Sequence, residues 1–107
     1  MRYTPLPLAG FAYRGIIGIE MRKTSRRAAF VYLLLCADGT IYTGWTFSIR
    51  RRVREHQRGR GARYTRARRP VELIYHERFP SRCAAMRREV EIKGMARKSK
   101  LMLANSE

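Results

Sequence analysis

The 107-residue chain has few acidic residues: 8 aspartate and glutamate side chains stand against 24 lysine and arginine side chains. The formal net charge at pH 7 is therefore +16, and the isoelectric point is about 11.3. A chain so short of negative charge is expected to bind a polyanion, and nucleic acid is the first candidate. A membrane surface is the lesser alternative. The predominance of arginine favours bidentate contacts with phosphate.

Cysteine is also scarce, since the sequence contains only Cys36 and Cys83. Two cysteines without a CxxC pair do not make a disulfide framework, and with two histidines they argue against a structural zinc site. We therefore expect two buried thiols in a reducing cytosol. No window approaches the roughly 20 apolar residues of a membrane-spanning helix. We expect a cytoplasmic protein without membrane contact, associated with the nucleoid if it is bacterial.

The length and the hydrophobic content of 45% are typical of one small globular domain. Residues 1–29 lack a hydrophobic period and contain two prolines, three glycines and a basic run at 21–27. We interpret this segment as a poorly ordered N-terminal extension with a basic arm, which either contacts phosphates or is simply solvated. The domain itself is expected to span residues 30–104.

A β-hairpin is the strongest local signal in the chain. Residues 30–36 and 41–45 are apolar runs of strand-forming side chains, and Asp38-Gly39 lies between them. An Asp-Gly pair flanked in this way predicts a tight connection between two antiparallel strands. The first run is apolar throughout, so its strand should be buried on both faces.

The length of the hairpin loop decides where two tyrosines point. A two-residue turn would put Tyr32 and Tyr42 on opposite faces, because side chains alternate along a strand. A three-residue loop pairs Cys36 with Thr40 and puts both phenols on one face. Such loops usually have glycine in the left-handed position, which Gly39 would occupy. We therefore predict the three-residue loop.

A helix is predicted directly after the second strand. Thr46 or Ser48 can cap its start, and Gly59 can end it. Arg52 and His56 are four residues apart and lie along one edge of its apolar stripe. Both side chains should therefore lie at the border of the core.

The following segment, residues 62–70, is predicted to be a basic loop around Tyr64. Ten arginines and a single acidic residue lie between positions 50 and 69. Basic residues interleaved with an aromatic ring suit a phosphate track with one stacking platform. We assign nucleic-acid binding to Arg51, Arg58, Arg60, Arg63, Tyr64, Arg66, Arg68 and Arg69.

Residues 71–79 alternate in polarity and predict a third strand with one exposed face. Ser81 can cap a second helix that Gly94 ends, and residues 98–104 predict a short final helix. His76 on the third strand has no role that the sequence assigns.

Glu89 stands out on the second helix because it lies within the arc that should face the core. Two apolar edges flank it on a helical wheel: Cys83, Met86 and Val90 on one side, and Ala85, Ile92 and Ala96 on the other. A carboxylate there costs several kcal/mol unless it is paired or binds a cation. Arg82 and Lys93 are the candidate partners.

These residue types together suit phosphodiester hydrolysis. A carboxylate can hold a divalent metal ion that polarises a phosphoryl oxygen. A guanidinium can offset charge on the equatorial oxygens. A phenol or an imidazole can position or deprotonate the attacking water.

The chain resembles the GIY-YIG endonuclease superfamily in three blocks. Its first motif corresponds to Phe-Val-Tyr at 30–32, and its second to Tyr-Thr-Gly at 42–44. The sequences RRVREH at 51–56, GARYTRARRPVELIYHE at 61–77 and RREVEIK at 87–93 resemble the small, stand-alone, single-domain branch. Phe30 replaces the glycine of the first motif and Thr43 replaces the isoleucine of the second; both keep strand character and leave the tyrosines unchanged.

The resemblance implies an α+β fold, in which a small three-stranded antiparallel sheet is flanked by two or three helices. It also implies one-metal hydrolysis of a nucleic-acid phosphodiester with one Mg²⁺ or Mn²⁺ ion. By matching position, Tyr32 and Tyr42 would surround the attacking water, Arg52 would contact the scissile phosphate, His56 would assist water activation and Glu89 would bind the metal.

We therefore expect a metal-dependent endonuclease that acts on DNA in repair or processing, with RNA as the other candidate substrate and no obligate protein partner. The alternative is a non-catalytic nucleic-acid-binding protein that keeps the fold and the basic face. A third hypothesis is a ribosome- or RNA-associated basic protein with no site. The complete set of tyrosines, arginine, histidine and glutamate favours the first.

Overall fold

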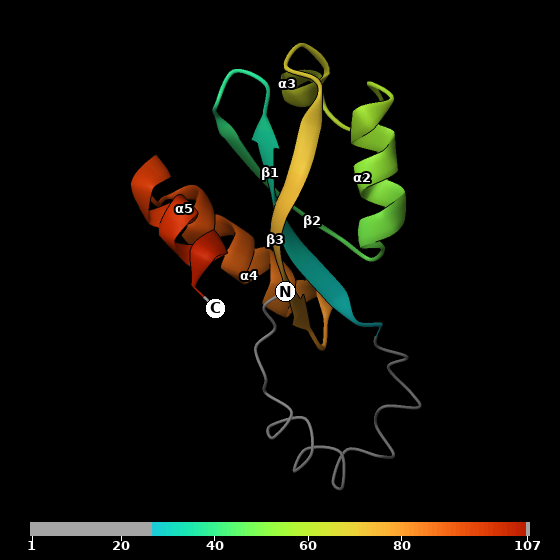
Figure 1. The fold of residues 1–107 in the computed structure, drawn as a ribbon. Helices are drawn as coiled ribbons and strands as arrows, with labels where there is room; N and C mark the ends of the chain where they lie inside the picture. The colour runs from blue at the N-terminus through green and yellow to red at the C-terminus, as the bar shows by residue number, and fades with distance from the viewer. Residues whose placement is uncertain (1–26, 107) are drawn as a thin grey trace, which may run out of the picture.

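The computed structural model describes residues 27–106, which form an α+β fold (Figure 1). The elements in chain order are β1 (Ala29–Cys36), β2 (Ile41–Thr46), α2 (Ile49–Gln57), α3 (Arg63–Arg66), β3 (Val71–Phe79), α4 (Arg82–Lys93) and α5 (Arg97–Asn105). The predicted three-stranded antiparallel sheet is confirmed. The predicted extension and basic arm lie outside the described residues, apart from positions 27–29. No helix in the range 27–106 is long and apolar enough to cross a membrane.

The sheet has the strand order β2-β1-β3, so β1 is central. Its continuous apolar sequence suits this place, because helices cover both of its faces. Figure 1 shows α2 and α3 on one side of the sheet, and α4 and α5 on the other. On the α2 side, Tyr32 and Leu34 form a core with Ile49 and Val53. On the α4 side, a second core includes Val31, Leu33, Ala85 and Ile92.

The hairpin has the predicted three-residue loop. The Cys36 backbone N–H donates to the Thr40 carbonyl at 2.9 Å, and the Gly39 N–H donates to the Cys36 carbonyl at 2.9 Å. Gly39 has a φ of +88°, the left-handed conformation that glycine adopts without steric cost. Tyr32 and Tyr42 consequently lie on one face, with ring centroids 6.3 Å apart.

Both predicted helix caps are present. The Ser48 hydroxyl accepts the Arg51 backbone N–H, and the Ser81 hydroxyl accepts the Ala84 backbone N–H. Each bond satisfies an N–H group that has no partner within the helix. Of the two candidates for the first cap, Ser48 rather than Thr46 fills the position. These caps fix where α2 and α4 leave the hairpin and β3.

Two expectations about local structure are wrong. The basic loop at 62–70 contains a turn of helix, α3, because the Ala62 carbonyl accepts the Arg66 N–H at 3.0 Å. The apolar edge of α4 formed by Cys83, Met86 and Val90 is exposed, and Val90 is 68% exposed. A single helix can turn only one stripe toward a sheet, and α4 turns Ala85 and Ile92 of the other edge inward, whereas Ala96 of that edge lies beyond the end of α4 and is exposed. Cys83 is therefore an exposed thiol, whereas Cys36 is buried as predicted.

A partly buried ion pair ties α4 to β3. The Arg88 guanidinium donates to both carboxylate oxygens of Glu77, at 2.9 and 3.3 Å, and to Glu91 at 3.0 Å. The Tyr75 hydroxyl donates to the same Glu77 carboxylate at 2.7 Å. The side chain of Glu77 is 9% exposed. The network holds the inward face of α4 against the sheet at the position next to Glu89.

Replacing Thr43 with valine is expected to stabilise the fold. Thr43 is 3% exposed, and its hydroxyl oxygen has no hydrogen-bond partner within residues 27–106. Valine has the same shape without the buried hydroxyl, so Thr43→Val should raise the free energy of unfolding by about 1 kcal/mol. Urea denaturation followed by circular dichroism measures this change. Thr40→Val is the contrast: it removes a hydroxyl that donates to Asp38 at 2.6 Å, so no gain is expected.

Candidate active site

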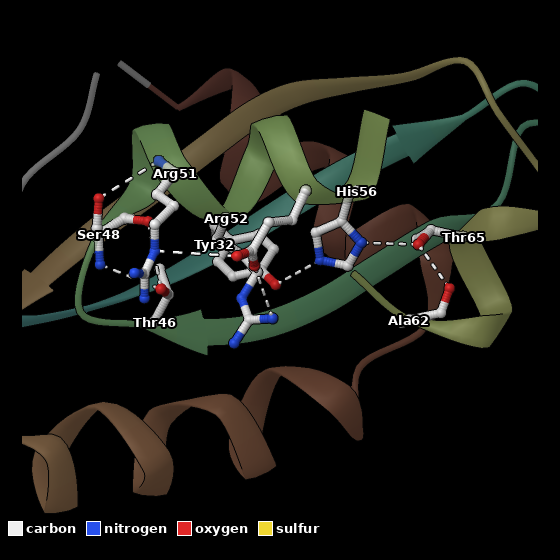
Figure 2. Close-up of polar contacts among 9 residues, drawn as sticks. Tyr32, Thr46, Ser48, Arg51, Arg52, His56, Ala62 and Thr65 are labelled. Carbon is white, nitrogen blue, oxygen red and sulfur yellow. Dashed lines mark hydrogen bonds and ion pairs between the residues drawn. The ribbon is translucent and has the colours of Figure 1, made fainter. Parts of the chain in front are cut away.

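A hydrogen bond between Tyr32 of β1 and His56 of α2 forms the centre of the candidate site (Figure 2). The phenol oxygen lies 2.8 Å from His56 Nε2. Both side chains are buried, Tyr32 at 2% exposure and His56 at 0%. The sequence predicted both residues for the site, and the tertiary structure brings them into direct contact.

Tyr42 and Arg52 border this pair. The Tyr42 ring centroid lies 5.1 Å from that of His56. Arg52 is on the same side of α2 as His56, and Figure 2 shows both side chains extending from the helix toward Tyr32. The Arg52 side chain is 37% exposed, and its Nη1 lies 3.3 Å from a carboxylate oxygen of Glu55. The guanidinium therefore remains accessible from solvent beside the buried pair.

Burial keeps the two central groups neutral. It is the main cause that raises the pKa of the Tyr32 phenol far above its ordinary value; Tyr42 and Glu89 raise it further, and the charge of Arg52 opposes them. Burial, aided by the charge of Arg52, lowers the pKa of the His56 imidazole. At neutral pH Tyr32 is therefore protonated and His56 is uncharged.

The side chains of Tyr32 and His56 occupy space that is free because Gly44 and Gly61 have no Cβ atom. Gly44 is the register partner of Tyr32, and a Cβ atom at Gly44 would lie 2.6 Å from the Tyr32 hydroxyl oxygen. A Cβ atom at Gly61 would overlap the imidazole ring of His56. Glycine is required at both positions because a neighbouring side chain approaches the backbone closely, and not because the backbone adopts a left-handed conformation. Gly44 is part of the second motif that the sequence analysis identified.

Gly61→Ala is expected to displace His56 and to lower the free energy of unfolding by about 1–3 kcal/mol. His56 is fully buried and contacts both Tyr32 and Thr65, so a shift of the ring disturbs every contact at the centre of the site. Chemical denaturation measures the loss. Gly94→Ala is the matched control, because its Cβ atom would come no closer than 3.6 Å to any neighbour. Equal stability of the two variants would contradict the close packing at Gly61.

Thr65 is a site residue that sequence reasoning missed. It lies in α3, is 0% exposed, and its Oγ1 is 2.7 Å from His56 Nδ1. The same oxygen lies 3.2 Å from the Ala62 carbonyl oxygen. A threonine in a segment rich in arginine carries no sequence signal of its own and would be taken for a solvated residue. Only the packing of α3 against α2 reveals the contact.

Glu89 lies in α4, which packs against β1 and β2. Its side chain is 17% exposed, and its Oε2 lies 3.4 Å from Lys93 Nζ. Of the two candidate partners that the sequence offered, Arg82 and Lys93, it is Lys93 that lies within ion-pair distance of Glu89. The charge of Glu89 also acts on Tyr32, since it contributes to the raised pKa of that phenol. The Glu89 carboxylate is thus close enough for its charge to act on the Tyr32 phenol.

The residues assigned to nucleic-acid binding divide into two groups. The first group is exposed on α2, on α3 and between them, and it consists of Arg51, Arg58, Arg60, Arg63 and Arg66. The second group also makes contacts within the fold. Arg68 donates to Asp38 at 2.9 Å, and Arg69 donates to the carbonyl oxygens of Arg66 and Gln57.

The Tyr64 ring already contacts two other side chains of the domain. Its ring stacks on Tyr42 at 5.9 Å between centroids, and the Arg68 guanidinium lies 3.8 Å above it. The ring is 37% exposed, so it is still partly accessible. A base that stacked fully on Tyr64 would compete with Arg68 or Tyr42, a constraint that the sequence did not indicate.

The chain has relatives among known proteins. The GIY-YIG catalytic domain family matches residues 28–102. The chain belongs to this family. Its domain indicates a nuclease superfamily, and the substrate class that a GIY-YIG nuclease domain implies is nucleic acid.

Relatives of this GIY-YIG domain are small proteins of similar extent. A UPF0213 protein of Natronomonas pharaonis is 55% identical over 78 residues, which are 73% of this chain and 92% of the relative. A UPF0213 protein of Staphylococcus aureus is 47% identical over 74 residues, which are 69% of this chain and 90% of the relative. The solution NMR structure of EF2693 from E. faecalis has a TM-score of 0.50 at 38% identity and covers 73% of this chain and 84% of that one.

GIY-YIG nucleases generally use divalent metals, and the donor set here fits such an ion only in part. Within residues 27–106 no group of three or more histidine, cysteine, aspartate or glutamate side chains converges on one point. That excludes an all-protein cage in the described part of the chain. Mg²⁺ commonly needs no cage, because it binds through one or two carboxylates and completes its shell with water and phosphate oxygens. A hard oxygen ligand such as Glu89 suits Mg²⁺ or Mn²⁺.

Proposed function

We propose that this GIY-YIG domain is a divalent-metal-dependent endonuclease that hydrolyses DNA phosphodiester bonds in repair or related processing. The observation that carries the proposal is the contact between Tyr32 and His56, with Arg52 and Tyr42 beside it and the charge of Glu89 acting on the same phenol. A neutral phenol bonded to a neutral imidazole, next to an accessible guanidinium, is more than packing requires.

Each residue has a separate task in this proposal. Tyr32 and Tyr42 hold the attacking water, and His56, through its bond with Tyr32, takes part in removing the proton of that water. Arg52 offsets the charge that grows on the phosphate oxygens in the transition state. Glu89 would hold one Mg²⁺ or Mn²⁺ ion, which supplies polarisation of a phosphoryl oxygen and stabilisation of the leaving oxygen when bound.

The exposed arginines on α2, on α3 and between them would hold the nucleic acid against this site. They share the side of the sheet on which Tyr32, Tyr42 and His56 lie. Phosphate contacts of this kind position a strand without reading its sequence, so binding should weaken steeply as salt increases.

One observation favours the non-catalytic alternative. Lys93 already lies 3.4 Å from the Glu89 carboxylate, and an ammonium group there neutralises the charge that a metal ion would otherwise meet. A protein that only bound nucleic acid would need nothing else at this position. Because the Lys93 side chain is 56% exposed, it can turn to solvent when a cation binds.

The deciding experiment is a cleavage assay with single-stranded, duplex and branched DNA and with RNA, in Mg²⁺, Mn²⁺ or EDTA. We expect cleavage of at least one DNA substrate with a divalent ion and none with EDTA. Arg52→Ala should lower the rate by at least about 100-fold, whereas Arg50→Ala, an exposed arginine on the same helix, should stay within a few-fold. Binding of every substrate without cleavage of any would support the non-catalytic alternative.

A further inference from the structure

We infer that Thr65 sets the tautomer of His56, so that the imidazole accepts the Tyr32 proton and Tyr32 is the group that faces the attacking water. The part that concerns water rests on the proposed nuclease function. The part that concerns the tautomer stands on the contacts of His56 alone. Thr65 acts here as a positioning residue, because it contacts His56 and no reacting atom.

The first step is that both ring nitrogens of His56 are already occupied. Nε2 lies 2.8 Å from the Tyr32 hydroxyl oxygen, and Nδ1 lies 2.7 Å from the Thr65 hydroxyl oxygen. The ring is 0% exposed, so it has no direct route to solvent or substrate. A neutral imidazole carries one N–H, so one nitrogen must donate and the other must accept.

The second step is the single proton of the Thr65 hydroxyl. Its oxygen lies 3.2 Å from the Ala62 carbonyl oxygen, a group that can only accept (Figure 2). When the hydroxyl donates to Ala62, its lone pair faces Nδ1 and requires an N–H there. In the competing arrangement the hydroxyl donates to Nδ1, the contact with Ala62 is lost, and the imidazole N–H points at Tyr32. The phenol would then need another acceptor within a buried site.

The consequence is a defined direction for the proton. With the N–H on Nδ1, Nε2 has a free lone pair and accepts the Tyr32 hydroxyl proton. The Tyr32 oxygen keeps its own lone pairs for the attacking water. When an O–H bond of that water breaks, the proton forms a new bond to the Tyr32 oxygen while the original phenol proton passes to Nε2. Tyr32 ends neutral, His56 ends as imidazolium, and the hydroxide that is left attacks phosphorus.

The third step is that α3 is held firmly enough to present Thr65. Arg68 N–H donates to the Thr65 carbonyl at 2.9 Å, and the Arg68 guanidinium donates to the Tyr64 carbonyl at 2.9 Å. Gly61 leaves room for the imidazole, because a Cβ atom there would overlap ring atoms that include Nδ1. His56 is thus enclosed between α3 and β1, and its ring orientation is fixed from both sides.

The test is a direct reading of the tautomer by NMR. Side-chain ¹⁵N shifts of the intact protein distinguish a protonated Nδ1 from a protonated Nε2, and His76→Gln assigns the signals because His56 and His76 are the only histidines. We expect the wild type to carry its proton on Nδ1. Thr65→Ser should keep that state, and Thr65→Val should move protonation toward Nε2. A wild-type proton on Nε2 would overturn the inference without any variant.

The rate of DNA cleavage is the second measurement. Under single-turnover conditions Thr65→Val should lower the rate by at least about 10-fold, Thr65→Ser should restore most of it, and DNA binding should not change. Ser99→Ala, which removes an exposed hydroxyl from α5 on the opposite side of the sheet, should leave the rate unchanged. If the wild type cuts nothing, the proposed function fails while the NMR result still decides the tautomer. If Thr65→Val keeps Nδ1 protonated and cuts at the wild-type rate, the inference fails while the nuclease proposal survives.

Discussion

Glu89→Gln is expected to lower the rate of metal-dependent DNA cleavage by roughly 1,000-fold or more, with little change in fold or in DNA binding. The amide keeps the shape of the side chain but removes the negative charge that would bind the ion. Glu89 is the carboxylate of the site, and its side chain is partly buried at 17% exposure. Within residues 27–106 no cluster of metal-binding side chains could take its place. A cleavage assay at saturating Mg²⁺ or Mn²⁺ measures the loss.

Glu72→Gln is the matched control, because it removes an exposed carboxylate from β3 and should cut at the wild-type rate. Isothermal titration of Mn²⁺ gives a second measurement that does not need cleavage: the wild type should bind the ion more tightly than Glu89→Gln. Full activity of Glu89→Gln would rule out Glu89 as the metal ligand. Lost activity together with a lower melting temperature would point instead to a role for Glu89 in folding.

Arg88→Ala is expected to cost about 3 kcal/mol of folding free energy, the largest stability effect that we predict. It would leave the Glu77 carboxylate, which is 9% exposed, without the guanidinium that donates to both of its oxygens. Tyr75 donates one hydrogen bond to Glu77, which cannot offset the loss of the positive charge. Urea denaturation at neutral pH measures the difference.

The control for this variant is Arg87→Ala, which removes an exposed arginine from the same helix and should change stability by no more than about 0.5 kcal/mol. Similar stabilities for the two variants would show that the ion pair contributes little to the fold. Because Arg88 is adjacent to Glu89, Arg88→Ala should also slow cleavage under conditions where it remains folded.

Much of the fold follows from local sequence. Asp38-Gly39 and the two apolar runs predict the hairpin and, through the left-handed position of Gly39, its register. Ser48 and Ser81 predict the two caps. These features depend on residues close in sequence, whose backbone preferences act before any tertiary contact forms. The register alone places Tyr32 and Tyr42 on one face.

Tertiary structure decided the features that depend on distant residues. The choice between the two apolar edges of α4 could not be made from a helical wheel, because each edge is apolar enough to be buried. Glu77 and Arg88 are eleven residues apart on different elements, so neither residue indicates the other. Arg68 and Arg69 resemble the other arginines in sequence, and only packing separates those that contact the fold.

The sequence by itself predicted the fold class, the hairpin register and every residue of the candidate site except Thr65. Only the tertiary structure decided which of these side chains form hydrogen bonds with one another, because the contact of Thr65 with His56 depends on the packing of α3 against α2. Local patterns report which face of an element a side chain occupies. They do not report which group on another element contacts that side chain. At this site the proposed transfer of the Tyr32 proton to His56 depends on such a contact, the one between Thr65 and His56.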